Sequence, residues 1–142
     1  METVLELKKK YANAIERIAM AEKIPDTSKE IIPEGILYLS HPFGGLKDNM
    51  VEAGQIANRF QKEMGTKGTI ISPIHNFSWL AYREESNGYW EDIYHCLVLL
   101  SHCDGMILSG DWKKSLGCCI ECLYCVEHDI PLYVEAKEKH HG

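Results

Sequence analysis

A short polar segment holds the residues of this sequence that are best placed to do chemistry. Ser115, Gly117 and Glu121 are spaced as S-x-G-x-x-x-E, a few residues after the apolar run 106–108. A polar loop with a glycine that opens a helix leaves backbone N–H groups able to bind an anion. Glu121 lies about one helical turn after Gly117, so its carboxylate can face the same cleft. The spacing predicts a phosphate site beside a carboxylate, which suggests chemistry on a phosphorylated sugar.

These residues need a scaffold, and the apolar patterning of the chain predicts strands that alternate with helices. Strands are predicted at residues 36–40, 69–72, 104–108 and 132–134. The first helix between them is predicted to start at a cap formed by Asp48 or Asn49. Two further helices are predicted at residues 88–102 and 117–128. Alternating strands and helices imply a parallel sheet covered on both faces. We therefore predict a doubly wound α/β fold with a mainly parallel sheet of four to five strands.

Ligands of such folds bind beyond the carboxyl ends of the strands. The loops predicted at that edge are residues 41–47, 73–87 and 109–117. The predicted fold therefore brings Ser115 and Gly117 to the edge where a ligand would bind.

The first third of the chain precedes this alternation. Residues 3–22 have apolar positions at helical spacing and are predicted to form one amphipathic helix, docked on the domain or on a partner subunit. We divide the chain into an N-terminal helix and linker (1–35), an α/β domain (36–135) and a C-terminal tail (136–142).

Composition restricts the class of partner. The 142 residues suffice for one domain, and the net charge of −6 argues against binding to a nucleic-acid polymer. No run of 18 apolar residues is present, so no membrane span is predicted. The first residues include Glu2 and Glu6 and lack the apolar core of a signal peptide, so we expect a cytoplasmic protein. We expect its partner to be a small molecule.

Cysteines cluster in the last predicted helix. Cys119, Cys122 and Cys125 are spaced as C-x-x-C-x-x-C, like part of an iron–sulfur run, but Asp129 stands where the next cysteine would be. Cysteine is a common small buried residue in intracellular proteins. We favour packing over a cluster or zinc site, and predict no metal and no cofactor.

Three segments, taken together and in order, carry a resemblance to a known family. They are residues 38–45 (YLSHPFGG), 97–106 (LVLLSHCDGM) and 108–121 (LSGDWKKSLGCCIE). This order resembles the nucleoside 2-deoxyribosyltransferase-like family, which includes base-exchanging transferases and 2′-deoxynucleoside 5′-monophosphate N-glycosidases. The resemblance covers roughly residues 36–134.

The resemblance implies roles for individual residues. It makes Glu121 the nucleophile that attacks the anomeric carbon, places Tyr38 near the sugar, and assigns Ser115 and Gly117 to a 5′-phosphate loop. Lys113 and Lys114 beside that loop would favour phosphate. Further substrate-binding candidates are Ser40, His41, Gly44, Gly45 and Trp112. Members of the family are usually homo-oligomers, so a homo-oligomer is expected here too.

One position departs from the family pattern. The second acid, which helps to protonate the departing base, would fall eight residues before Asp104, where this chain has Cys96. A neutral thiol is a poor replacement for a carboxyl group that must deliver a proton near pH 7. Asp92, one turn earlier on the same helix, is our candidate for that acid, with Glu91, His41 and His75 as alternatives.

Two functions stay open at this point. The first is an N-glycosidase or deoxyribosyltransferase that acts on a (deoxy)nucleoside 5′-monophosphate through Glu121. The second is a protein that binds a nucleotide or an ADP-ribose-like ligand in the same pocket without cleaving it, which Cys96 favours. Each site residue also has an ordinary structural interpretation: Glu121 as a solvated helix residue, and Tyr38 and Trp112 as core residues.

Overall fold

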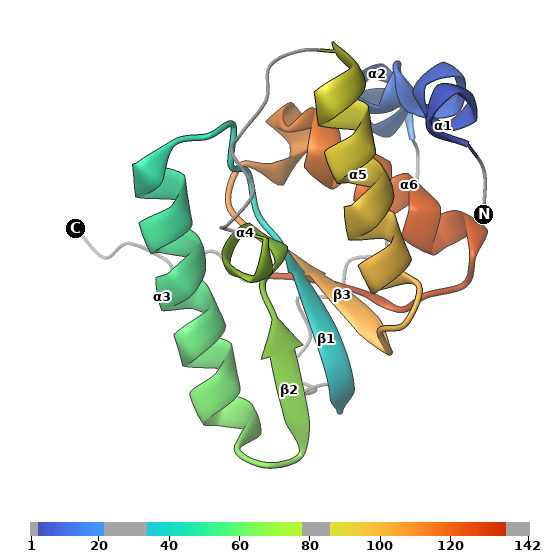
Figure 1. Cartoon of the computed structure of the whole chain (residues 1–142). Helices are drawn as coiled ribbons and strands as arrows, with labels where there is room; N and C mark the ends of the chain where they lie inside the picture. The colour runs from blue at the N-terminus through green and yellow to red at the C-terminus, as the bar shows by residue number, and fades with distance from the viewer. Residues whose placement is uncertain (1–2, 22–33, 78–85, 136–142) are drawn as a thin grey trace.

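A parallel sheet forms the centre of the molecule. The computed structural model describes residues 3–21, 34–77 and 86–135. In these residues the four strands are β1 (Gly35–Ser40), β2 (Gly68–Ile71), β3 (Gly105–Leu108) and β4 (Leu132–Val134). Every pair is parallel, and the order across the sheet is β2-β1-β3-β4 (Figure 1). The predicted α/β fold with a parallel sheet is confirmed, and the strand order changes direction between β1 and β3.

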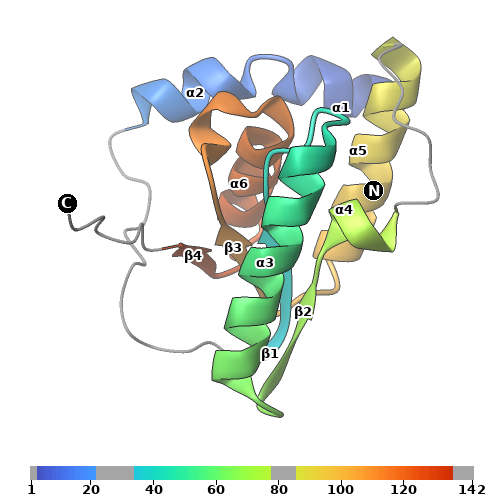
Figure 2. The ribbon, with the colours of Figure 1, turned by 90° about the vertical axis from the view of Figure 1, so that its left-hand side faces the viewer.

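Helices cover both faces of this sheet. α3 (Lys47–Met64) lies on one face, and α5 (Ser86–Leu100) and α6 (Leu116–Glu127) lie on the other (Figures 1 and 2). Side chains alternate along a strand, so Leu37 and Leu39 pack with α3, whereas Tyr38 packs in the cluster that contains α5 and α6. Both faces of β1 are therefore buried, as expected for a central strand of a parallel sheet.

The N-terminal segment forms two helices instead of the single helix predicted over 3–22. α1 (Val4–Tyr11) and α2 (Ala14–Met20) are separated at Ala12 and Asn13. Asparagine is a weak helix former, and the Arg17 guanidinium donates to the Lys10 carbonyl oxygen at 3.1 Å, which satisfies one of the last carbonyls of α1.

These two helices pack on α5 and α6 of the same chain (Figure 2). The buried side chains on their inner faces are Leu7, Tyr11, Ala14 and Ile18, and all four belong to the core cluster that contains Tyr38. The Tyr11 hydroxyl donates to Glu127 of α6 at 2.9 Å, and Lys10 forms an ion pair with the same carboxylate at 2.7 Å. The N-terminal helices are thus continuous with the core that supports α6.

Most element boundaries agree with the prediction within two residues, a normal uncertainty for helix and strand ends. The exception is the start of α3, where Leu46 occupies the N-cap position and makes no side-chain cap. Asp48 and Asn49 lie inside the first turn, and the Asn49 amide donates to the Phe43 carbonyl oxygen at 3.0 Å. The described residues also form two short helices, α4 (Pro73–Asn76) and η1 (Trp112–Lys114). Within the described residues, no helix combines the length and apolar character that a membrane span requires.

Candidate active site

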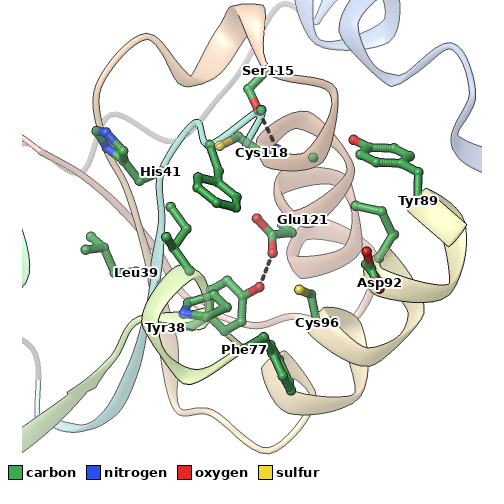
Figure 3. Close-up of a pocket in the computed structure, with 16 residues that line it drawn as sticks. Tyr38, Leu39, His41, Phe77, Tyr89, Asp92, Cys96, Ser115, Cys118 and Glu121 are labelled. Carbon is green, nitrogen blue, oxygen red and sulfur yellow. Dashed lines mark hydrogen bonds between the residues drawn. The ribbon is translucent and has the colours of Figure 1, made fainter. Parts of the chain in front are cut away.

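A cavity, here called the inner cavity, lies beyond the carboxyl end of β1, beside the start of α6 (Figure 3). Its volume is about 160 Å³. The wall is mainly apolar and aromatic, with Phe43, Ile74, Phe77, Tyr89 and Ile93 among its members. The polar side chains that line it include Tyr38, Asp92, Ser115 and Glu121. The cavity therefore lies where strand order reverses, the usual ligand position of doubly wound sheets.

Glu121 projects into this cavity from α6, and β1 holds its carboxylate. The Tyr38 hydroxyl donates to Oε2 (Figure 3). The Ser40 hydroxyl donates to Oε1 at 2.8 Å. Because residues two apart on a strand share a face, Tyr38 and Ser40 both point at α6. Only 7% of Glu121 is exposed, so the interpretation as a solvated helix residue is wrong.

The environment of Glu121 favours its neutral form more than water does. Burial raises the pKa of Glu121 from 4.5 to about 7, and the hydrogen bonds from Tyr38 and Ser40 oppose that rise because they stabilise the carboxylate. A carboxyl group with this pKa ionises near neutral pH, in the range that general acid–base or nucleophilic chemistry uses.

Tyr38 is fully buried between Glu121 and Cys96 (Figure 3). Burial, followed by the charges that Cys96 and Glu121 carry when ionised, raises the pKa of Tyr38 well above 10, so its hydroxyl keeps its proton. Burial and Glu121 raise the pKa of the Cys96 thiol to about 12. The Cys96 thiol, at the position where the resemblance implies an acid, therefore stays protonated near pH 7.

Of the four candidates for the missing acid, Asp92 and His41 line the inner cavity. Asp92 lies on α5, one turn before Cys96. Glu91 is exposed and lines neither cavity described here. His75 is exposed on α4, where its Nδ1 is 2.7 Å from the Ser72 hydroxyl oxygen, and it lines neither cavity.

Ser115 occupies the N-cap of α6, a position where serine is a preferred residue. Its hydroxyl oxygen accepts from the Cys118 N–H at 3.3 Å. No group of the described residues accepts a hydrogen bond from the N–H of Leu116 or Gly117. A Cβ added to Gly117 would lie 3.6 Å from the Tyr89 hydroxyl oxygen, so a larger side chain would fill the cavity there. The start of α6 thus keeps donors and space for an anion.

The remaining predicted binding residues fall in different places. Gly44 lines the inner cavity and has a φ of 57°, a conformation that favours glycine. Gly45, with a φ of 75°, is exposed and lines neither cavity. Ser40 is buried beneath Glu121, which it orients. Trp112 is not brought to the cleft, since its ring is buried in the core cluster with Leu108 and Cys119.

A second cavity, the outer cleft, adjoins the first. It has a volume of about 710 Å³ and shares His41, Phe43, Gly44, Tyr89 and Ser115 with the inner cavity. Its other polar residues are Asn49, Glu52, Asp111 and Lys114. Lys114 therefore places a cation beside the start of α6, as predicted for the phosphate loop, whereas Lys113 lies over the Trp112 ring.

The four clustered cysteines pack in the core. Cys118, Cys119, Cys122 and Cys125 are buried in the cluster that contains Tyr38, and none forms a disulfide. Burial raises the pKa of each of these thiols, so they remain neutral. Across residues 3–21, 34–77 and 86–135, no three His, Cys, Asp or Glu side chains are grouped so as to hold a metal ion. Trp79 of the predicted loop 73–87, whose ring could stack on a base, and His140 and His141 of the predicted C-terminal tail lie outside the described residues.

Sequence reasoning did not find the aromatic wall of the inner cavity. Phe43 and Phe77 lie in loops predicted at the ligand edge, so aromatic residues in those loops were an available signal. Tyr89 lies in the first turns of α5, and only the packing of α5 against α6 shows that it faces Gly117.

Comparisons with known proteins add no relative. No protein-family model matches the sequence, and no curated protein and no solved structure matches this protein. The class of protein that can be stated is therefore a doubly wound α/β protein with a buried carboxylate in a cavity at the switch point.

Proposed function

We propose that this protein cleaves the N-glycosidic bond of a (deoxy)nucleoside 5′-monophosphate, with Glu121 as the nucleophile. The observation that carries the proposal is the carboxylate of Glu121, buried in a cavity and fixed by the hydroxyls of Tyr38 and Ser40. A carboxylate in this position suits a reaction in which positive charge develops on a sugar ring. The resemblance to the nucleoside 2-deoxyribosyltransferase-like family points to the same reaction.

The first step forms a covalent intermediate. A Glu121 oxygen attacks C1′ of the sugar, the bond from C1′ to the base nitrogen breaks, and its electron pair leaves with the base. Each carboxylate oxygen has two acceptor sites, so an oxygen bonded to Tyr38 or Ser40 still has a lone pair for the attack. These hydroxyls orient the group without blocking it.

The departing base needs a proton, and Asp92 is our candidate donor. It lines the inner cavity and lies one helical turn from Cys96, which occupies the position of the family's second acid. In the second step water attacks C1′, its proton passes to the Asp92 carboxylate, and Glu121 is regenerated as sugar phosphate leaves. A second base that attacks in place of water would give base exchange.

The start of α6 is the proposed phosphate site. The unused N–H groups of Leu116 and Gly117 and the positive end of the helix favour an anion, and Lys114 adds a full charge nearby. The apolar and aromatic wall of the inner cavity suits the planar base. A cytoplasmic location and a homo-oligomer complete the proposal, and the family resemblance favours the homo-oligomer.

The alternative function is nucleotide or ADP-ribose-like ligand binding without cleavage. One observation favours it: Cys96, with a thiol pKa of about 12, replaces the carboxyl group that would protonate the base. Cleavage releases the free base, whereas binding alone releases none, so detection of free base distinguishes the two functions.

The test is incubation with deoxynucleoside 5′-monophosphates and the matching nucleosides, followed by chromatography for free base. Wild type should release base from a monophosphate, and Glu121→Ala should not. Glu63→Gln, an exposed substitution on α3 away from both cavities, is the matched control. Base release that survives in Glu121→Ala would refute the mechanism, and tight binding without release by wild type would establish the alternative.

A further inference from the structure

The outer cleft contains a histidine that the proposed reaction does not use. His41 follows β1, and only 2% of its side chain is exposed. Its Nδ1 lies 2.9 Å from the Ser109 hydroxyl oxygen, and that hydroxyl donates its proton to the Ser40 carbonyl oxygen at 2.8 Å. Since Ser109 has no second proton, the contact with His41 requires Nδ1–H to be the donor.

This hydrogen-bond chain determines what the other ring nitrogen can do. Burial lowers the pKa of His41 from its ordinary 6.5, although Glu52 and Glu135 oppose the shift, so the ring is neutral at pH 7. A neutral ring with its proton on Nδ1 has an unprotonated Nε2, which can only accept a hydrogen bond. Gly110 packs against this ring so closely that a Cβ there would lie 2.7 Å from Cε1, which keeps the ring in place.

Nε2 faces a second acceptor. It lies 3.9 Å from Oε1 of Glu52 on α3, too far for a hydrogen bond. A ligand that carries two neighbouring hydroxyls beside this pair can donate one hydrogen bond to each acceptor. Asp111 adds a further carboxylate to the lining of the same cleft.

The charges of the outer cleft exclude a phosphate from the part of it that Glu52 and Asp111 line. Among the described residues that line it, Lys114 is a cation beside Ser115, whereas Glu52 and Asp111 are acids. A terminal phosphate extended toward these carboxylates would be repelled. An uncharged group that carries several hydroxyls would instead donate to His41 Nε2 and to the carboxylates.

We infer that the outer cleft is a subsite for a sugar attached through the 5′-phosphates of the nucleotide, so that the ligand is a nucleoside diphosphate sugar. The volume of about 710 Å³ is more than a phosphate group fills and lies in the range of small-molecule sites, roughly 300–1,000 Å³. This inference rests on the proposed function, because it assumes that the base enters the inner cavity and that phosphate lies at the start of α6.

The experiment measures binding by calorimetry in two matched series. The first is AMP, ADP and ADP-ribose, and the second is UMP, UDP and UDP-glucose, so that the choice of base does not decide the result. In at least one series the sugar nucleotide should bind about tenfold or more tightly than its diphosphate, the worth of one hydrogen bond to a charged group. Equal or weaker binding of the sugar nucleotide in both series would overturn the inference.

Three variants identify the residues responsible. Glu52→Gln removes the carboxylate, and His41→Asn keeps a donor for Ser109 while it removes the Nε2 acceptor. In both, the ratio of sugar-nucleotide to diphosphate affinity should fall toward one, whereas Glu63→Gln, on the same helix as Glu52 but outside the cleft, should keep the wild-type ratio. A wild-type ratio in both cleft variants would also overturn the inference.

The same samples, analysed for free base, separate this inference from the proposed function. Base release from a monophosphate with no sugar preference would support the reaction and reject the subsite. A sugar preference that depends on Glu52 and His41, with no base released from any ligand, would support the subsite and reject the reaction.

Discussion

The hydroxyl of Tyr38 on β1 donates a hydrogen bond to the carboxylate of Glu121 on α6, although 83 residues separate the two in the chain. Ser40, two residues further along β1, holds the other oxygen of the same carboxylate at 2.8 Å. The strand thus determines the orientation of a carboxyl group that the helix supplies. This relationship gives the cavity a fixed, buried acid whose protonation can be tested.

Tyr38→Phe should raise the pKa of Glu121 above about 7, because it removes a hydrogen bond that stabilises the carboxylate. If ionised Glu121 is the nucleophile, the rate of base release rises with pH up to that pKa. The rising part should therefore move to higher pH, with a rate at pH 7 lower by about tenfold, the scale of one hydrogen bond to a charged group. A pH–rate profile from pH 5 to 9 checks this.

Tyr94→Phe is the matched control for that profile, since Tyr94 lies on α5 and lines neither cavity. Superimposable profiles for wild type and Tyr38→Phe would contradict the role given to Tyr38.

Glu121→Gln should make the protein more stable at pH 8 than wild type. The folded wild type keeps a proton on Glu121 up to about pH 7, whereas the unfolded chain releases it near pH 4.5. Stability must then fall as pH rises between those values and stay lower above them. Ionised Glu121 lowers the wild-type free energy of unfolding by on the order of 3 kcal/mol, since each unit of pKa difference between the folded and unfolded states contributes about 1.4 kcal/mol.

Urea denaturation at pH 5 and pH 8 measures this effect. Glu121→Gln should raise the free energy of unfolding by roughly 1–3 kcal/mol at pH 8 and by less at pH 5. The gain at pH 8 falls short of the full value because the amide makes some of the carboxylate's hydrogen bonds imperfectly. An equal effect at both pH values would mean that Glu121 does not carry the pH dependence.

Asp92→Asn should slow base release far more than Cys96→Ser. Loss of a general acid costs about 10²- to 10⁴-fold. A thiol with a pKa of about 12 supplies no proton near pH 7, so its replacement by a hydroxyl should change the rate less than about tenfold. Single-turnover measurement of free base isolates this step, with Glu91→Gln as control on the same helix. The reverse order of effects would remove Asp92 from the mechanism.

Ser115→Ala should weaken both the helix and the phosphate site. Loss of the N-cap costs about 1 kcal/mol of folding free energy. The KM for a nucleoside 5′-monophosphate should also rise more than that for the nucleoside, since Ser115 lines the cavity at the proposed phosphate position. Ser101→Ala offers the control, because that hydroxyl donates to the Val98 carbonyl oxygen at the far end of α5. Equal changes in both KM values would argue against phosphate at Ser115.

Much of the architecture follows from local sequence. Short apolar runs bounded by glycine, proline and polar residues identify the four strands of the described residues, because helices cover both faces of a parallel sheet. The alternation of side chains puts Tyr38 and Ser40 on one face of β1, and Ser115 with Glu121 can be read as a cap and an inward residue of one helix. Each of these features depends only on residues that are close together in the sequence, within about two helical turns.

The partners of those residues depend on tertiary structure alone. No local pattern shows that Cys96 adjoins Tyr38, or that Trp112 turns into the core while Tyr89 lines the cavity. No local pattern shows either that α1 and α2 dock on α5 and α6 of the same chain. Helical and strand spacing determine which face a side chain occupies, but its neighbour across a layer depends on how whole elements pack to bury apolar surface. The sequence by itself therefore determined the elements and the candidate carboxylate, and packing between distant elements decided its hydrogen bonds, its burial and its pKa.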